Sequence, residues 1–369
     1  MNKNKVFFLV LFVLASVFAF AAFNAAGVSA QGSLDELIAA AQAEGTLTTI
    51  ALPRDWCNYG AAIDGFKAKY GIEVNELNPD GASADEIEAV KANKDNKGPQ
   101  APDVLDVGYS FGPQLIAEGL VEPYKVSTWD SIPDDAKHPD GYWYGDYYGI
   151  LAFEVNADLV ETVPQDWADL LKPEFKNQFA LSGDPRVSTQ AQMSVYAASL
   201  YNGGSLDDVT PGLDFFKQVN AAGNFVPLIA KQATVAKGET PVILRWDYNA
   251  LADRDALDGN PTIEVVYPAS GTIAGVYIQA ISAYAPHPNA AKLWMEYLYS
   301  DEGQNIWLSG YCHPIRFEDM KANGTLDPEV AAKLPSFDGP VAFPTLDQLN
   351  AANAAIAENW MAVVGADVK

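Results

Sequence analysis

The sequence predicts an α/β protein with mostly parallel sheets, flanked by helices and divided between two domains. In roughly the first 120 residues, β-branched segments alternate with helical segments at short spacing, which is typical of βα units. The chain has 369 residues, enough for two domains of ordinary size. No flexible linker separates its halves, so we expect the chain to cross between the domains more than once.

The beginning of the chain predicts a cleaved signal peptide, residues 1–30. Lys3 and Lys5 precede an apolar run at 6–22, and the small residues near Ala30 suit a signal peptidase. A retained membrane helix is the alternative. No cysteine stands at the cleavage site, so a lipid anchor is not indicated. We expect an exported protein that is soluble after cleavage, in the periplasm or outside the cell.

Alternation is clearest in the first domain. Residues 34–43 have the spacing of an amphipathic helix, with Ser33 as its N-cap and Gly45 as its stop. The β-branched segment 46–52 predicts the first strand. The elements expected next are a helix at 60–71, a strand at 72–78, a helix at 84–96, a strand at 102–109 and a helix at 112–119.

The later part has more turns and aromatic residues. Residues 148–156 predict a strand leading out of the first domain, and Pro173 divides 166–181 into a helix and a strand. A start at Ser188 and a stop at Gly204 define another helix. The remaining expected elements are a helix at 213–223, strands at 240–246, 261–268 and 275–285, and helical structure at 289–310.

Charge and motifs exclude several classes of function. The formal net charge is −25 and the acids are spread along the chain, so we expect no binding to nucleic acid. The motifs G-x-S-x-G, H-E-x-x-H, the P-loop and G-x-G-x-x-G after a strand are absent. The histidines His138, His287 and His313 each precede a proline in a turn-like setting. We expect a binding protein without a cofactor or metal, rather than an enzyme.

Two cysteines, Cys57 and Cys312, leave two possibilities open. An even count in an exported protein permits a disulfide, and two free thiols are the alternative.

Candidate ligand-binding residues follow the predicted strands, because ligands of open parallel sheets sit beyond the carboxyl ends of strands. These loops combine aromatic rings with polar side chains, as small-molecule clefts do. Arg186 at a helix start suits a carboxylate or phosphate, although an ion pair with Asp184 is the structural alternative. Trp246 and Asp247 suit a cationic nitrogen. The candidates in these loops are Asp55, Trp56, Tyr59, Tyr109, Ser110, Asp184, Arg186, Ser188, Thr189, Arg245, Trp246, Asp247 and Tyr248.

Four segments give the chain a resemblance to a known family. They are "DWCNYGAAIDGFKAKYGIEV", "PDVLDVGYSFGPQLIAEGLVEPY", "YGILAFEVNADLV" and "AAKLWMEYLYSDEGQNIWLSGYCHPIR". In order and spacing they resemble the extracellular solute-binding proteins of ABC importers. The likeness is to the type II periplasmic binding proteins, in the branch of polyamine, iron(III), thiamine and phosphonate binders.

This resemblance implies two α/β lobes, joined by two crossing strands, that close on a ligand about a hinge. The first lobe would comprise 31–150 and 279–369, and the second 151–278. Cys57 and Cys312 would then both lie in the first lobe, where they could pair.

The resemblance also bears on individual residues. Trp56, Tyr59 and Tyr109 stand where the polyamine binders have ligand-facing residues, and Trp246 matches a Trp in a "W-x-x-x-A" turn. The return crossing has Gly275 and Tyr277 where that branch has a Trp and an Asp, which weighs against a polyamine; Tyr277 joins the ligand-binding candidates. Only Tyr248 represents the tyrosine pair of the iron binders. The segment "GDPR" resembles loops that hold an anion.

We therefore expect a monomeric binding protein that captures a small anionic or zwitterionic organic solute and delivers it to an ABC permease in the membrane. A polyamine or other cationic amine, and ferric ion, are the alternative ligands. A secreted hydrolase is the alternative from another class. We also expect Trp246→Ala to weaken ligand binding while leaving the stability of the free protein nearly unchanged.

Overall fold

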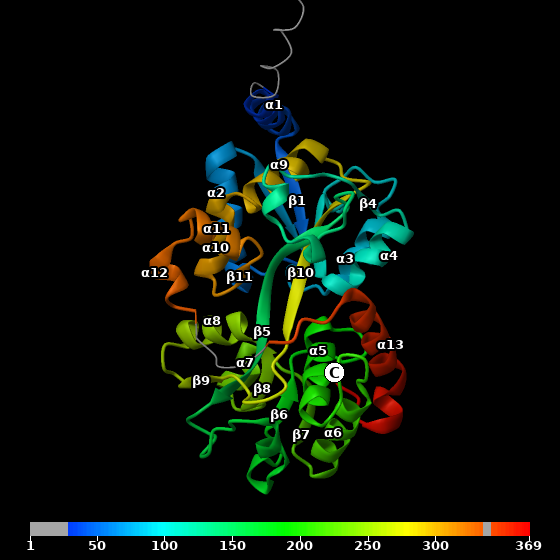
Figure 1. The fold of residues 1–369 in the computed structure, drawn as a ribbon, viewed down its shortest axis with the longest axis vertical. Helices are drawn as coiled ribbons and strands as arrows, with labels where there is room; N and C mark the ends of the chain where they lie inside the picture. Colours follow the sequence, from blue (N-terminus) through cyan, green and yellow to red (C-terminus); the bar gives the residue numbers. More distant parts are fainter. Residues whose placement is uncertain (1–28, 335–340) are drawn as a thin grey trace, which may run out of the picture.

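Two lobes stacked along the long axis of the molecule make up the structure (Figure 1). The computed structural model describes residues 29–334 and 341–369. Two long strands, β5 (Tyr144–Asn156) and β10 (Ala274–Ser282), run from one lobe to the other. The expected α/β class and the two crossing strands are confirmed.

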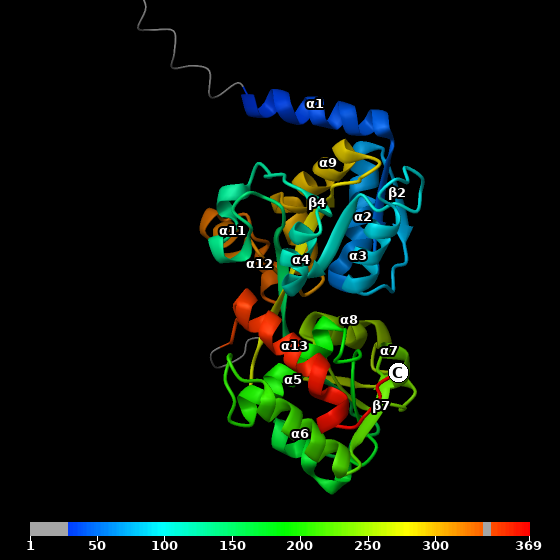
Figure 2. The ribbon, with the colours of Figure 1, turned by 90° about the vertical axis from the view of Figure 1, so that its right-hand side faces the viewer.

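The first lobe, uppermost in Figure 1, contains the early elements and a later helical group. Helix α1 lies across its outer end (Figure 2). There the Glu44 carboxylate accepts the backbone N–H groups of Asn289 and Ala290 and so caps α9. The elements are α1 (Ser29–Glu44), β1 (Thr46–Ile50), η1 (Trp56–Asn58), α2 (Tyr59–Tyr70), β2 (Glu73–Leu77), α3 (Ser83–Ala92), β3 (Val104–Gly108), η2 (Tyr109–Phe111), α4 (Gly112–Ala117), β4 (Val121–Glu122), η3 (Trp129–Ser131), η4 (Asp134–Ala136), α9 (Pro288–Leu298), α10 (Asp301–Ser309), β11 (His313–Pro314), α11 (Phe317–Asn323) and α12 (Pro328–Ala331).

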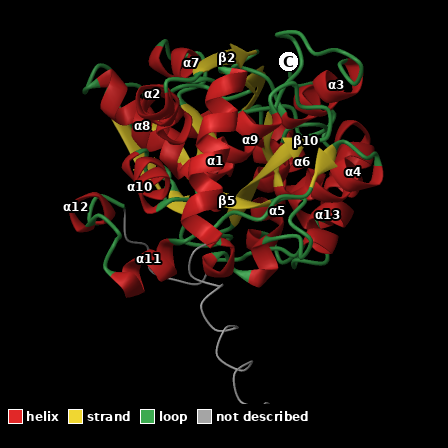
Figure 3. Ribbon diagram, turned by 90° about the horizontal axis from the view of Figure 1, so that it is seen from above, coloured by secondary structure: helices red, strands yellow, loops and turns green. Residues whose placement is uncertain are grey.

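The second lobe packs helices around the other half of the sheet (Figure 1). Seen from above, with α1 of the first lobe in front, helices surround the strands of the molecule (Figure 3). The helix expected within 166–181 is wrong in type. Two short 3-10 turns stand there instead, and Pro173 begins the second of them. The elements are η5 (Trp167–Leu171), η6 (Pro173–Phe175), β6 (Phe179–Leu181), α5 (Thr189–Tyr201), α6 (Thr210–Ala221), β7 (Phe225–Ile229), α7 (Gln232–Ala236), β8 (Val242–Trp246), α8 (Asp247–Leu257), β9 (Ile263–Val266) and α13 (Leu346–Val363).

Strand directions differ between the crossing strands and the rest. Strands β1 and β2 pair in parallel, as do β6 with β7 and β6 with β8. Every antiparallel pairing between the described strands involves β5 or β10. The sheet is therefore mixed. Among the described strands, the expected parallel pairing is found for β1 with β2 and for β6 with β7 and β8. Strands β3, β4, β9 and β11 pair only with a crossing strand, and they do so antiparallel.

A disulfide joins Cys57 to Cys312, with 5.5 Å between their Cα atoms. It connects the short turn η1 to the segment after α10, 255 residues later in the chain. The possible pairing of these two cysteines is thus present in the structure.

The last helix, α13, belongs to the second lobe and not, as expected, to the first. Residues 279–369 were assigned to the first lobe, but α13 packs on α5 and α6 of the second (Figure 2). Trp360 is fully buried there, with ring centroids 5.5 Å from Phe216 and 6.1 Å from Phe225. The apolar side of α13 completes the core of the second lobe, which local sequence patterns do not reveal. The other expected boundaries stay a prediction.

The described residues contain no helix that is long and apolar enough to cross a membrane. The apolar run of the expected signal peptide lies within residues 1–28, outside the described part of the chain.

Replacing Trp360 tests the position of α13. We expect Trp360→Ala to lower the free energy of unfolding by about 3–5 kcal/mol, because it leaves a large cavity between α13 and α6. The neighbouring Met361 is 43% exposed, and Met361→Ala should change stability by less than about 0.5 kcal/mol. Urea denaturation measures both values. Equal small effects would place α13 away from the core.

Candidate ligand-binding site

A pair of glycines marks the place where the crossing strands pass between the lobes. Gly149 of β5 and Gly275 of β10 are direct partners in the antiparallel ladder. Tyr147 lies two residues before Gly149 and Tyr277 two residues after Gly275, which is the same direction in this antiparallel pair, and their rings stack with centroids 5.7 Å apart. Side chains two residues apart point to the same face of a strand, so the two glycines and the two tyrosines lie on one face of the paired strands. This face has no side chains at the glycines and carries aromatic rings next to them.

Two rings from the second lobe lie on this face at the glycines. A Cβ atom at Gly275 would overlap the ring of Trp246, and one at Gly149 would overlap the ring of Tyr248. The two rings stack on each other with centroids 6.5 Å apart. The glycine at 275, a departure from the polyamine binders, is therefore required by the close approach of Trp246 to the strand.

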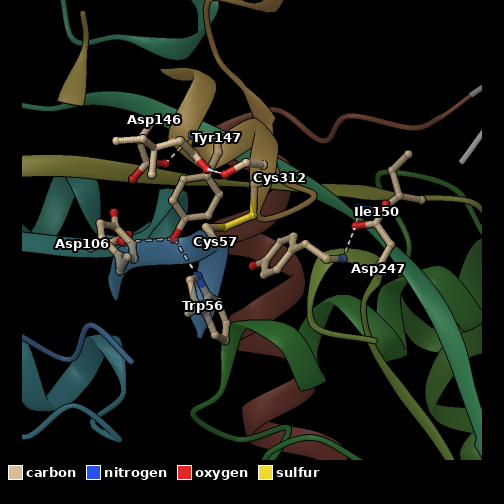
Figure 4. Close-up of a disulfide and its surroundings, with 12 residues drawn as sticks. Trp56, Cys57, Asp106, Asp146, Tyr147, Ile150, Asp247 and Cys312 are labelled. Atoms are coloured by element: carbon tan, nitrogen blue, oxygen red, sulfur yellow. Dashed lines mark hydrogen bonds between the residues drawn. A yellow bond between two sulfur atoms is a disulfide. The ribbon is translucent and has the colours of Figure 1, made fainter. Parts of the chain in front are cut away.

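Trp56 of the first lobe closes the group from the other side. Its ring centroid lies 5.3 Å from that of Tyr248 and 5.5 Å from that of Tyr277, and its Nε1–H donates to the Tyr147 hydroxyl at 2.7 Å (Figure 4). We call Trp56, Tyr147, Trp246, Tyr248 and Tyr277 the aromatic cluster. It joins both lobes and both crossing strands, and the disulfide at Cys57 fixes the turn that carries Trp56.

Buried carboxyl groups lie behind the aromatic cluster. The hydroxyls of Tyr147 and Tyr59 donate to Asp106 Oδ2 at 2.9 and 2.6 Å. Asp146 accepts from Gln279 Nε2 at 3.0 Å, and its carboxyl interacts with that of Asp106. Burial raises the pKa of Asp106 to about 6 and raises the pKa of Asp146 well above its usual range. This pair of carboxyl groups therefore favours holding a proton in the folded protein.

The strand-end loops meet across the lobes beside this cluster. Ser110, after β3, accepts a hydrogen bond from Asn353 Nδ2 of α13 at 3.2 Å. Thr189, at the start of α5, lies against Gly108, and its buried hydroxyl has no hydrogen-bond partner among the described residues. Ser188 packs against Gly183 in its own loop, and Tyr109 donates its hydroxyl to the Asp135 carbonyl at 2.8 Å.

Both arginines among the candidates are already paired with carboxylates. Arg186 contacts Asp184 and, from the end of the chain, Asp367 at 2.9 Å. Arg245 contacts Glu154 and Asp253. The ion pair of Arg186 with Asp184, the structural alternative, is present, and the anion-binding role of Arg186 stays a prediction.

The positions of three other candidates are as follows. Asp247 is fully buried and accepts the N–H groups of Ile150 and Tyr248, so it is not free to pair with a cation; burial raises its pKa to about 7. Tyr59 is fully buried beside Asp106, and Asp55 is exposed on the loop before Trp56.

Trp246 is fully buried as well, so the expected small effect of Trp246→Ala on stability is wrong. A buried Trp contributes several kcal/mol to stability through packing alone.

Sequence reasoning missed several residues of this site. Tyr147 lies inside a strand rather than after one, and Asp106 and Asp146 also stand within or next to strand residues. A Tyr two residues before a strand glycine was the available signal. Asn353 could not be found, because its helix was assigned to the other lobe.

A separate surface cavity of about 290 Å³ lies away from the cluster. Its lining includes Leu206, Asp207 and Asp208 before α6, Thr210 at the start of α6, and Asp347, Gln348 and Ala355 of α13.

Two α/β lobes that meet at an aromatic cluster on two crossing strands define a clamp-like binding protein. Residues 100–361 match the family of bacterial extracellular solute-binding proteins, so the chain belongs to this family. The resemblance noted in the sequence is confirmed, and the family is one of binding proteins rather than enzymes.

Individual relatives agree with this assignment. The spermidine/putrescine-binding periplasmic protein of Salmonella typhimurium is 29% identical over 199 residues, which cover 50% of this chain and 51% of that protein. The sulfate-binding protein of Escherichia coli is 26% identical over 229 residues, 59% of this chain and 64% of that protein. The matches thus span between about half and two thirds of these relatives.

A solved structure confirms the two-lobed fold. It is the periplasmic binding protein AfuA from Actinobacillus pleuropneumoniae with bound fructose-6-phosphate. The two chains are 21% identical, with a TM-score of 0.65 over 86% of this chain and 98% of that one.

The pair of buried carboxyl groups predicts a pH dependence of stability. With folded pKa values raised, the pair holds protons that the unfolded chain has released, so the free energy of unfolding falls as the pH rises from about 4 through about 6, and falls further as the pH passes the raised pKa of Asp146. We expect Asp146→Asn to reduce this fall by about 1–3 kcal/mol. Urea denaturation at pH 4.5, 6 and 8 measures it.

The control is Asp134→Asn, at a side chain that is 99% exposed, which should leave the pH dependence unchanged. The same fall in the Asp146→Asn protein as in the wild type would contradict the assignment.

Proposed function

We propose that this chain is the substrate-binding protein of an ABC importer. It captures a small polar organic solute between its lobes and delivers it to a membrane permease, without catalysis and without a cofactor. Its membership of the solute-binding family supports this role. The observation that carries the proposal is the meeting of Trp56, Tyr248 and Tyr277, which come from the two lobes and a crossing strand.

Export by a cleaved signal peptide is part of the same proposal. The disulfide between Cys57 and Cys312 suits an oxidising compartment such as the periplasm or the outside of the cell. We propose that the protein works there as a monomer.

Binding would couple to closure of the lobes. A solute that touches Trp56 and Tyr248 together is held only when the lobes approach, so its binding shifts the population towards the closed form. The contact between Ser110 and Asn353 would form in the same movement.

For the ligand, we propose a zwitterionic solute, with a cationic amine as the second candidate. Aromatic faces attract a positively charged nitrogen, and the buried carboxyl groups of Asp106 and Asp146 lie directly behind Tyr147. Arg186, which was expected to hold an anion, forms ion pairs with carboxylates, and so does Arg245, the other arginine among the candidates. The relatives are named for ligands of opposite charge, spermidine/putrescine and sulfate, so the choice of ligand class here rests on the residues of this chain.

A thermal-shift screen tests the proposal. The panel contains amines, amino acids, phosphonates, sugar phosphates, thiamine and ferric ion. We expect an amino acid or another amine-bearing compound to raise the melting temperature by several degrees at about 100 times its Kd, where binding adds about 2.7 kcal/mol. Turnover of any compound would contradict a binding protein, and stabilisation only by phosphonates or sugar phosphates would overturn the ligand class.

Substitution of single tryptophans tests whether the aromatic cluster is the ligand-binding site. We expect Trp56→Ala to weaken binding of the compound found in the screen at least about tenfold, because it removes the first-lobe wall of the cluster. Trp246→Ala should weaken binding and also destabilise the free protein by about 3–5 kcal/mol.

Trp129→Ala is the matched control. Trp129 is also partly exposed, but it packs on Tyr144 in the first lobe outside the cluster. Calorimetric titration should show unchanged affinity for this variant. Equal losses in Trp56→Ala and Trp129→Ala would remove the cluster from the binding site.

A further inference from the structure

The crossing strand β5 changes its neighbours close to Ile150. Ile150 is the last residue of β5 that pairs with β10, at Ala274, and Leu151 is the first that pairs with β8, at Trp246, on the opposite edge of β5. The Leu151 N–H still donates to the Ile273 carbonyl at 3.1 Å, so the change of partners spans a few residues around Ile150. Before this point β5 belongs with the strands of the first lobe, and after it with those of the second. A rotation of one lobe against the other must therefore change the backbone close to Ile150.

A buried carboxylate holds the backbone at this position. Asp247 is fully buried, and its Oδ1 accepts the Ile150 N–H at 3.0 Å and the Tyr248 N–H at 2.9 Å (Figure 4). Its Oδ2 accepts the Tyr267 hydroxyl at 3.0 Å. The bond to Tyr248 is local to the start of α8, but the bond to Ile150 joins residues 97 apart in the chain.

The sequence around Asp247 makes room for this contact. A Cβ atom at Gly149 would lie 3.2 Å from Asp247 Oδ1 and would overlap the ring of Tyr248. The glycine thus lets the carboxylate and the ring approach the crossing strand together. The residues on either side of Asp247, Trp246 and Tyr248, are the second-lobe members of the aromatic cluster.

We propose that Asp247 is a positioning residue that fixes the second-lobe half of the binding site to the hinge. Through its bond to Ile150, the segment Trp246–Asp247–Tyr248 follows the hinge backbone, so the rings and the angle between the lobes change together. This role rests on the proposed function, because it concerns the closure that captures a solute. It replaces the expectation that Asp247 touches the ligand itself.

A merely structural role would have a different consequence. An acidic residue in the first turn of a helix stabilises that helix, and its loss would weaken α8 without affecting the lobe arrangement. The two roles are therefore separated by the state of the hinge in the free protein.

The experiment compares Asp247→Ala with Asp247→Asn, without any ligand. Asparagine keeps an oxygen that can accept both N–H groups, whereas alanine removes it. We expect hydrogen exchange of residues 147–152 to become at least about tenfold faster in Asp247→Ala, because the Ile150 amide loses its partner. Small-angle scattering should show a larger radius of gyration for the same variant, and Asp247→Asn should restore both values.

Asp103→Ala is the matched control. Asp103 is likewise fully buried and accepts the N–H groups of Thr48 and His287, but it lies inside the first lobe. Its loss should lower the melting temperature and leave both the radius of gyration and the exchange of residues 147–152 unchanged. If Asp247→Ala does not fold, Asp247→Ser serves in its place, since its side chain is too short to reach the Ile150 amide.

Three outcomes would overturn the proposal. They are an unchanged radius of gyration in Asp247→Ala, an equal change in Asp103→Ala, and a failure of Asp247→Asn to restore the wild-type values. None of these measurements uses a solute, so they can fail while the proposed transport function stands, and the reverse also holds.

Discussion

The packing between the two lobes depends on the close approach of two aromatic rings to the backbone of the crossing strands. Trp246 and Tyr248 lie where side chains would otherwise project from Gly275 and Gly149, and these glycines are partners in one ladder. Any side chain there would push the second lobe away from the strands that join it to the first. The aromatic cluster, including its contact with Trp56, and the hydrogen bond from the Ile150 N–H to Asp247 all depend on this close packing.

The charged groups near the cluster are the reason for the ligand class that we propose. Arg186 and Arg245 each form ion pairs with two carboxylates. The carboxyl groups of Asp106 and Asp146, in contrast, are buried next to each other and have no basic partner among their described contacts. Burial disfavours their ionised forms, so the pair favours holding a proton. A cationic nitrogen placed near Tyr147 would reduce that cost, and this is the physical basis for preferring a zwitterion or an amine.

Much of the fold could be predicted from local patterns, because strand and helix periodicity and helix stops are local signals. The turn after β1 and the end of β8 were found in this way, and with them Trp56 and Tyr248. Pairings over long distances could not be predicted. Arg186 meets Asp367 181 residues later, and Glu154 meets Arg245 91 residues later. Tyr147 was missed because it lies within a strand, and Gly275 was taken as a lost contact although it makes room for Trp246.

A crystal structure of the protein with the solute that it retains during purification, or with the compound identified by screening, shows directly where the ligand binds. We expect electron density for that solute against Trp56, Tyr248 and Tyr277, touching both lobes, with Trp56 moved away from the ring contacts it makes in the present structure. Density confined to another place, such as the cavity beside Asp207 and Asp347, would contradict this expectation.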